Sequence, residues 1–377
     1  MTTIYLQTRT SMPAPALLRI HRPPPIAITP NIADMLSQHA PVAVGVSGGK
    51  DSQAAAMATF EHLDRVGHAG PRLLIHADLG VVEWKDSLPV CEQLASMLGT
   101  ELVVVRRKQG GLLERWESRW RSNVARYEDL STVTLVPCWS TPSMRFCTSE
   151  LKTTKIHAEL MRGFKGRPII SVVGVRREES RRRARAAVAD QNPRNGIWTW
   201  RPIVDWREDE VFDFIDARGV EPHPAYRQFG MTRVSCRFCI MSSLADLHAA
   251  ACQPETHDLY RRMVDLECRS TFAFQGARWL GDIAPHLLDR DALAALAAAK
   301  DLARQRIEAE CRITPPMLYV KGWPTRMLSD SEADRLADAR ATVSGLLGLN
   351  ARYLDRVAIH GRYAELRAAR TNKAQAA

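Results

Sequence analysis

The sequence predicts a doubly wound, Rossmann-like α/β domain, in which a parallel sheet has helices on both faces, followed by a mainly helical C-terminal extension. Short apolar runs alternate with helical patterns from residue 41 onward, and this alternation is typical of parallel strands joined by right-handed crossovers. A glycine-rich segment directly follows the first apolar run, at the position where such folds bind ligands. After residue 243 the chain becomes rich in Ala, Leu and Arg, which favours helix.

Local patterns predict the individual elements. Apolar runs predict strands at residues 42–46, 72–76, 101–105 and 168–173. Helical patterns predict helices at residues 53–63, 87–98, 207–215 and 291–300. Asp205 is expected to cap the helix that begins near residue 207, with Glu208 completing a capping box.

The chain is expected to contain three parts. Residues 1–40 form a Pro-rich N-terminal arm, residues 41–243 the nucleotide-binding domain, and residues 244–377 the helical extension. No apolar run approaches the roughly 20 residues that a membrane span needs, and no secretory signal is recognisable. We therefore expect a cytoplasmic protein with no membrane contact, whose eight cysteines stay reduced.

Positive charge is concentrated in one part of the chain. The net charge is +10, and residues 101–201 contain 21 Lys and Arg against 10 Asp and Glu, so this segment alone carries +11. A basic segment suits a polyanionic ligand such as a nucleotide or a nucleic acid. Five tryptophans of this segment are expected in the core rather than stacked on bases, namely Trp116, Trp120, Trp139, Trp198 and Trp200.

The most specific motif is Ser-Gly-Gly-Lys-Asp-Ser at residues 47–52, between the first predicted strand and its helix. Gly48 and Gly49 lack a Cβ atom, so the backbone can turn sharply and bring N–H groups close to an anion. These groups and the N-terminus of the next helix form a phosphate site. The two serines add hydroxyl groups, and Lys50 adds a positive charge. The spacing differs from the Walker pattern.

This motif resembles the signature of the PP-loop ATP pyrophosphatases, which have an adenine nucleotide alpha hydrolase-like fold. The resemblance implies that residues 47–52 bind ATP with Mg²⁺, and that the bond between the α and β phosphates is cleaved. Lys50 and Asp51 are then expected to bind the nucleotide and to act in catalysis. The other nucleotide-binding residues of the motif are Ser47, Gly48, Gly49 and Ser52.

Further segments resemble the phosphoadenosine-phosphosulfate (PAPS) reductase branch of these proteins, so the resemblance covers residues 41–243. Residues 75–83 are similar to an Asp-Thr-Gly-x-x-x-Glu segment, although Leu79 replaces the usual Thr, and residues 174–183 are similar to a Gly-x-Arg-x-x-Glu-Ser-x-x-Arg segment. Asp78 and Arg176 are expected in catalysis. The nucleotide-binding residues that these matches imply are Asp78, Gly80, Gly174, Arg176, Glu179, Ser180 and Arg183.

The arginine run at residues 176–185 also suggests an anion on physical grounds. It contains six Arg and only two acidic residues. A guanidinium group offers paired donors that match phosphate oxygens. Without an anion among them, so many like charges would repel one another.

Three cysteines suggest a metal site. Cys147 lies 89 residues before Cys236, which forms a CxxC motif with Cys239. In iron–sulfur members of the resembling family, a Cys-Cys pair and a distant CxxC hold a 4Fe–4S cluster. Because Phe146 precedes Cys147 here, the fourth ligand is either Cys138 or absent. Three alternatives stay open: a 4Fe–4S cluster, Zn²⁺, and uncoordinated thiols.

Three functions are compatible with these features. The first is an ATP pyrophosphatase that adenylylates an oxygen acceptor in DNA or tRNA for sulfur transfer via a cysteine-bound iron–sulfur cluster, with a sulfur donor such as a cysteine desulfurase as partner. It is similar to the sulfurtransferases of DNA phosphorothioation and to tRNA thiolases. The second is a sulfonucleotide reductase that releases sulfite, although the Glu-Cys-Gly-Leu-His tail of such enzymes is missing. The third is a non-catalytic module that binds nucleotides or nucleic acid.

Overall fold

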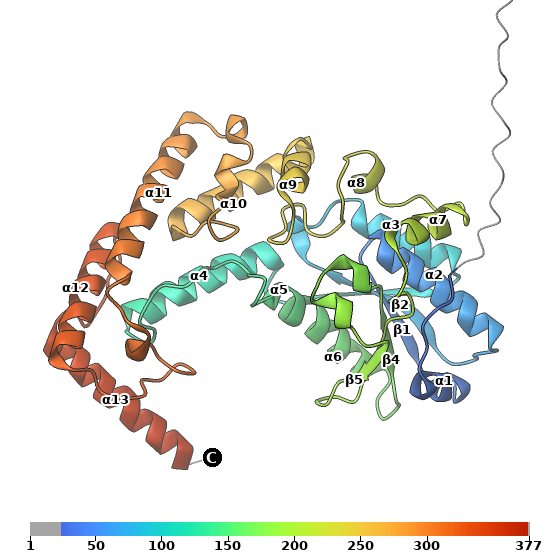
Figure 1. Ribbon diagram of the computed structural model, residues 1–377, viewed down its shortest axis with the longest axis horizontal. Coiled ribbons are helices and arrows are strands. Elements are labelled where there is room, and N and C mark those ends of the chain that lie inside the picture. Colours follow the sequence, from blue (N-terminus) through green and yellow to red (C-terminus); the bar gives the residue numbers. More distant parts are fainter. Residues whose placement is uncertain (1–23, 376–377) are drawn as a thin grey trace, which may run out of the picture.

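The computed structural model describes residues 24–375 and contains the predicted parallel sheet (Figure 1). The strand order is β3-β2-β1-β4-β6-β5. Neighbouring strands pair in parallel, except that β5 runs antiparallel to β6 at one edge. The four predicted strands are confirmed, and the short strands β5 and β6 are additional. The strands are β1 (Val42–Val46), β2 (Arg72–Asp78), β3 (Glu101–Arg106), β4 (Ile170–Val173), β5 (Ala189–Gln191) and β6 (Trp198–Trp200).

Helices cover both faces of the sheet, as predicted. Successive residues of a strand point to opposite faces, so Val42, Val44 and Val46 pack with α1, α2, α3 and α7, whereas Ala43 packs on the side of α6. A π-helical turn, Ser149–Thr153, joins α5 to α6. The helices of this domain are α1 (Pro30–Ser37), α2 (Lys50–Arg65), α3 (Ser87–Met97), α4 (Leu112–Glu128), α5 (Phe146–Thr148), α6 (Thr154–Gly163), α7 (Glu208–Asp216) and α8 (Pro224–Arg227).

The second half of the predicted arm packs against the sheet domain. Residues 30–37 form α1, whose Ile32 and Leu36 side chains are buried. Just before this helix, the carbonyl of Ala27 accepts a hydrogen bond of 2.8 Å from the indole N–H of Trp200. Residues 1–23, which contain the rest of the arm, lie outside the described part of the chain.

The start of α7 differs from the prediction. Arg207 is the N-cap residue, and the Glu210 carboxylate accepts a hydrogen bond of 2.7 Å from its backbone N–H. The predicted caps were wrong because both carboxylates have other cationic partners. Asp205 pairs with Arg177, and Glu208 pairs with Lys50 at 3.0 Å.

The helices after residue 243 share a core with α4. Trp116 and Trp120 on α4 lie edge-on to Phe274 and Phe272, which follow α10. As expected, Trp116, Trp120, Trp139 and Trp200 are buried, and Trp198 is half-buried. Within residues 24–375, no helix is both long enough and apolar enough to cross a bilayer. These helices are α9 (Leu244–Ala251), α10 (His257–Ser270), α11 (Arg290–Glu310), α12 (Asp330–Leu347) and α13 (Arg356–Gln375).

A buried arginine fastens the C-terminal end of α4 to this helical region. Arg340 on α12 is fully buried, and its guanidinium lies over the Tyr127 ring with 4.7 Å to the ring centroid. It donates hydrogen bonds to the carbonyl oxygens of Tyr127 at 2.8 Å and Arg352 at 2.6 Å. Carbonyl groups at a helix C-terminus have no partner within the helix, so the guanidinium satisfies them and also favours the helix dipole.

We predict that Arg340→Met loosens this junction. Removing the guanidinium takes two charged hydrogen bonds from the carbonyl groups of Tyr127 and Arg352, which should lower the free energy of unfolding by about 3 kcal/mol. Urea unfolding followed by tryptophan fluorescence would measure the change. Arg335→Met, on an exposed position of the same helix, should change stability by less than about 0.5 kcal/mol. Equal unfolding midpoints for the two variants would contradict the role given to Arg340.

Candidate functional site

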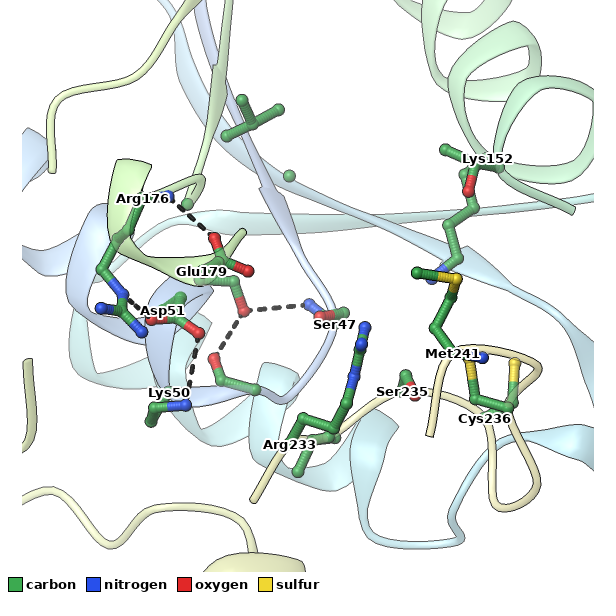
Figure 2. Close-up of a pocket in the computed structure, with 18 of the residues that line it drawn as sticks. Ser47, Lys50, Asp51, Lys152, Arg176, Glu179, Arg233, Ser235, Cys236 and Met241 are labelled. Carbon is green, nitrogen blue, oxygen red and sulfur yellow. Dashed lines mark hydrogen bonds and ion pairs between the residues drawn. The ribbon is translucent and has the colours of Figure 1, made fainter. Parts of the chain in front are cut away.

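A cavity of about 770 Å³ opens at the carboxyl ends of β1, β2 and β4 (Figure 2). Val46, Ala77 and Val173, at the ends of these strands, line it together with most of the loop at residues 47–52. The chain continues from β1 to β2 on one side, whereas β4 lies on the other side of β1. A crevice at such a reversal of strand order is where open α/β sheets bind ligands.

The loop at residues 47–52 adopts the tight turn that its two glycines allow. Gly48 has φ of +77°, and a Cβ atom there would lie 3.0 Å from the backbone of Ser87. Gly49 is the N-cap of α2, and the backbone N–H of Lys50 donates to the Tyr226 hydroxyl at 3.1 Å. The first turn of α2 therefore faces the cavity and presents the positive end of the helix dipole to it.

Lys50 is held between two carboxylates. Its ammonium lies 3.0 Å from Glu208 and 3.5 Å from Asp51, and it sits over the Tyr226 ring at 4.8 Å from the centroid. Burial lowers the pKa of Lys50, but Tyr226, Asp51 and Glu208 outweigh this effect and hold the pKa above its usual value. Lys50 is therefore charged, and its charge is balanced by its neighbours.

Arg176 is also balanced by carboxylates. Its guanidinium contacts Asp51 and Glu178, each at 2.6 Å. Burial lowers the pKa of Arg176, but Asp51 and Glu178 raise it above its usual value. The approach requires Gly174, because a Cβ atom at this position would lie 2.3 Å from the carbonyl oxygen of Asp51.

The arginine run is neutralised more fully than the sequence suggested. Besides Arg176, Arg177 pairs with Asp205 and Arg183 pairs with Glu179. Two of the carboxylates involved, Asp51 and Asp205, lie far from the run in sequence. Repulsion within the run therefore does not by itself require a bound anion.

The predicted nucleotide-binding residues divide into two groups. Nine of them line the cavity, namely Ser47, Gly49, Lys50, Asp51, Ser52, Gly174, Arg176, Glu179 and Arg183. Gly48, Asp78, Gly80 and Ser180 do not line it and instead support the surrounding backbone. Asp78 accepts a hydrogen bond of 2.7 Å from the Gly80 N–H and pairs with Arg106.

Three of the four candidate metal ligands reach this cavity. Cys147, Cys236 and Cys239 line it, and Cys236 lies on the opposite side from Lys50 and Asp51 (Figure 2). Burial raises the pKa of the Cys236 thiol, and the neighbouring Cys239 adds to this effect. The backbone N–H of Met241 donates to Cys239 Sγ at 3.4 Å.

Cys138 is not brought to the other cysteines. It is fully buried, and burial raises the pKa of its thiol to about 12. The adjacent Trp139 fixes this segment to the helical region by donating to the carbonyl of Phe272 at 2.8 Å. Within residues 24–375, no three His, Cys, Asp or Glu side chains are arranged to hold a metal ion. The side chains as placed therefore do not fit a four-cysteine cluster or zinc site.

Three cations at the cysteine end of the cavity were missed at the sequence level. Arg145 and Lys152 flank Cys147, and Arg233 lies just before Cys236. Within residues 24–375, none of them has a carboxylate at ion-pair distance, and the Arg233 Nε is buried without a hydrogen-bond partner. The sequence does place basic residues near Cys147 and Cys236, and this proximity could have indicated a cationic environment for the cysteines. The cavity thus has a neutralised loop end and a cationic cysteine end.

His76 links the strand that precedes the loop to the segment that pairs with Cys236, through hydrogen bonds of its two ring nitrogens. Its Nδ1–H donates to the carbonyl of Val46, just before the loop, at 3.0 Å, and its Nε2–H donates to Glu83 at 3.1 Å. Glu83 in turn forms a β-bridge with Cys236. Burial lowers the pKa of His76, but hydrogen bonds to Cys91 and Glu83 outweigh it and raise the pKa to about 10. Both ring nitrogens face acceptors, so the imidazolium form fits this position.

We predict that His76 makes stability depend on pH above neutrality. Because folding raises its pKa, the stabilisation is fully present below pH 6.5 and is lost as the pH rises toward 10. His76→Gln should therefore flatten the decline of the urea midpoint between pH 7 and pH 10. His286→Gln, on an exposed site, should retain the wild-type profile. A wild-type midpoint independent of pH in this range would contradict the assignment.

Comparison with protein families identifies one that matches more than half of the chain. The model of the phosphoadenosine phosphosulfate reductase domain matches residues 41–242. An uncharacterised 37.8 kDa protein of Escherichia phage 186 is 28% identical over 240 residues, which cover 55% of this chain and 70% of that protein.

Two solved structures are similar in part. PAPS reductase from Candida auris, in a phosphate complex, has a TM-score of 0.36 and 13% identity, and the match covers 56% of this chain and 98% of that one. The U34-tRNA thiolase NcsA from Methanococcus maripaludis, solved with its 4Fe–4S cluster, has a TM-score of 0.37 and 13% identity, with 84% and 85% of the chains covered.

Proposed function

The chain belongs to the phosphoadenosine phosphosulfate reductase domain family, and we propose that it is an ATP pyrophosphatase that activates an oxygen acceptor in nucleic acid for sulfur transfer. One observation carries this proposal. The nucleotide-binding loop and three cysteines line the same cavity, so an activated acceptor and a sulfur atom can meet there without leaving it.

The loop end of the cavity suits the triphosphate of ATP. Backbone N–H groups at the start of α2 face the cavity, and Lys50 and Arg176 flank them. Because both cations already have carboxylate partners, the nucleotide would enter with Mg²⁺, which neutralises phosphate charge and favours departure of pyrophosphate. Lys50 would then contact the phosphate chain, with Asp51 and Glu208 fixing its position.

The acceptor oxygen attacks the α-phosphorus, pyrophosphate leaves, and AMP remains attached to the acceptor. A sulfur species at the cysteine end then displaces AMP, which departs with the bonding electrons. Arg145, Lys152 and Arg233 lie beside the three cysteines. Their unbalanced positive charge would favour a thiolate or another sulfur anion.

No metal cluster is needed for this scheme, and none is used in it. The sulfur would come from a donor such as a cysteine desulfurase and would be carried as a persulfide on one cavity cysteine. After its outer sulfur has bonded to the acceptor, a second cavity thiolate would break the S–S bond, and an external thiol would reduce the resulting Cys–Cys disulfide before the next turnover. DNA and tRNA are both acceptors that the chemistry allows.

The second candidate function, reduction of a sulfonucleotide, is favoured by a cysteine thiol in the cavity and would release sulfite.

We predict that Lys50→Met lowers the production of AMP and pyrophosphate from α-labelled ATP about 100-fold, because a preorganised charge near the leaving group is lost. The assay would contain DNA or tRNA, and a parallel reaction would contain labelled PAPS. Lys165→Met, at an exposed site outside the cavity, should keep wild-type turnover. Sulfite from PAPS without AMP from ATP would instead establish the reductase. Nucleotide binding without either product would indicate a non-catalytic module.

A second pair of variants tests the cysteines. Cys236→Ala should abolish transfer of radioactive sulfur to nucleic acid while leaving pyrophosphate release intact, because Cys236 lines the cysteine end of the cavity and AMP leaves only when sulfur displaces it. Cys138→Ala should preserve both activities, since its thiol lies in the core, and should cost about 1 kcal/mol of stability. Loss of sulfur transfer in Cys138→Ala, together with stoichiometric iron in anaerobically purified protein, would restore Cys138 as a cluster ligand.

A further inference from the structure

We propose that a basic stripe on α4, ending at Arg145, is the surface on which the nucleic-acid backbone lies while its acceptor group enters the cavity. This inference rests on the proposed function and names the surface that would bind the acceptor. The stripe consists of Arg115, Arg119 and Arg126 on α4, and Arg145 at the cavity edge.

The stripe is continuous with the cavity. The guanidinium groups of Arg115 and Arg119 both lie over the ring of Phe146, at 5.0 Å and 4.8 Å from its centroid. Phe146 stands between Arg145 and Cys147, which both line the cavity. A chain bound along the stripe is therefore directed to the cysteine end.

Helix geometry places these arginines on one flank of α4. Arg115, Arg119 and Arg126 are spaced by four and seven residues, so they share one side of the helix. The buried side, with Trp116, Trp120 and Tyr127, packs against the helical region. At 1.5 Å per residue the stripe is about 16 Å long, which is enough to contact several successive phosphates.

The charges of the stripe are poorly balanced. Arg115 pairs with Glu150 at 2.7 Å, but no carboxylate of residues 24–375 lies at ion-pair distance from Arg119, Arg126 or Arg145. Arg119 donates to the carbonyl of Pro137 instead. Burial lowers the pKa of Arg119, and the charge of Arg115 lowers it further.

This imbalance distinguishes the stripe from Arg176, Arg177 and Arg183 of the arginine run, whose guanidinium groups pair with carboxylates of the protein. Like charges held close together without counter-charges repel one another, and a bound polyanion relieves that repulsion. A phosphodiester backbone supplies regularly spaced anions that guanidinium groups bind through paired donors. An acidic protein would supply carboxylates, but nothing on it would need to enter the cavity.

Binding to labelled oligonucleotides, measured by fluorescence anisotropy at several salt concentrations, tests the stripe without requiring turnover. The probes are a 20-nucleotide DNA strand, its duplex and an RNA stem-loop. Arg126→Gln should weaken binding about threefold to tenfold and reduce the slope of log K against log salt by about 0.7–0.9. The double variant Arg119→Gln, Arg126→Gln should reduce the slope by about twice as much.

Arg121→Gln is the matched control. Arg121 is exposed on the same helix but lies about 140° around its axis from Arg126, so its loss should change affinity less than twofold. Equal effects of Arg121→Gln and Arg126→Gln would overturn the stripe, as would equal competition by polyglutamate at the same charge concentration. Salt-dependent binding that Arg126→Gln weakens, in a protein that releases no AMP from ATP, would support the stripe and refute the pyrophosphatase. Preference among the three probes would identify DNA or RNA as the acceptor.

Discussion

The candidate site depends on one carboxylate, that of Asp51. It accepts a hydrogen bond of 2.6 Å from Arg176, which follows β4, and lies 3.5 Å from Lys50, which follows β1. These contacts join the two central strands at the point where the strand order reverses. They require close approach of the backbones, which only the missing Cβ atom of Gly174 allows. The geometry of the nucleotide loop is therefore set by an ion network as much as by its own glycines.

This network also determines how charge is distributed in the cavity. Because carboxylates balance Lys50 and Arg176, the loop end suits a ligand that brings its own counter-ion, as a nucleotide with Mg²⁺ does. At the other end, Arg145, Lys152 and Arg233 have no such partners among the described residues. That end suits an anion that arrives without a cation, such as a backbone phosphate or a sulfur anion. The two ends of one cavity thus favour two different reactants.

The sequence predicted the parallel sheet, the first two crossovers and the position of the residue 47–52 loop at the carboxyl end of β1, because these depend on local patterns and on a motif of contiguous residues. It did not predict which cations are balanced. Arg177 forms an ion pair with Asp205, and Arg176 forms one with Asp51. Such pairs depend on tertiary contacts between segments that are distant in sequence. For the same reason Cys138 appeared available as a ligand, although Trp139 anchors its segment in the core. The role that we propose for α4 was also not predicted, since it depends on which segments pack at the two ends of the helix.

The helical region after residue 243 affects the site through α4. One end of α4 meets Phe146 beside the cysteines, and the other end is held by Arg340 on α12. Figure 1 shows α4 extending from the sheet domain to the helices α12 and α13. A helix fixed at both ends keeps the spacing of its arginines, and a bound strand then loses less conformational freedom in finding its register. The extension thus holds the proposed substrate surface on α4 in place, and its residue Asp246 also lines the cavity.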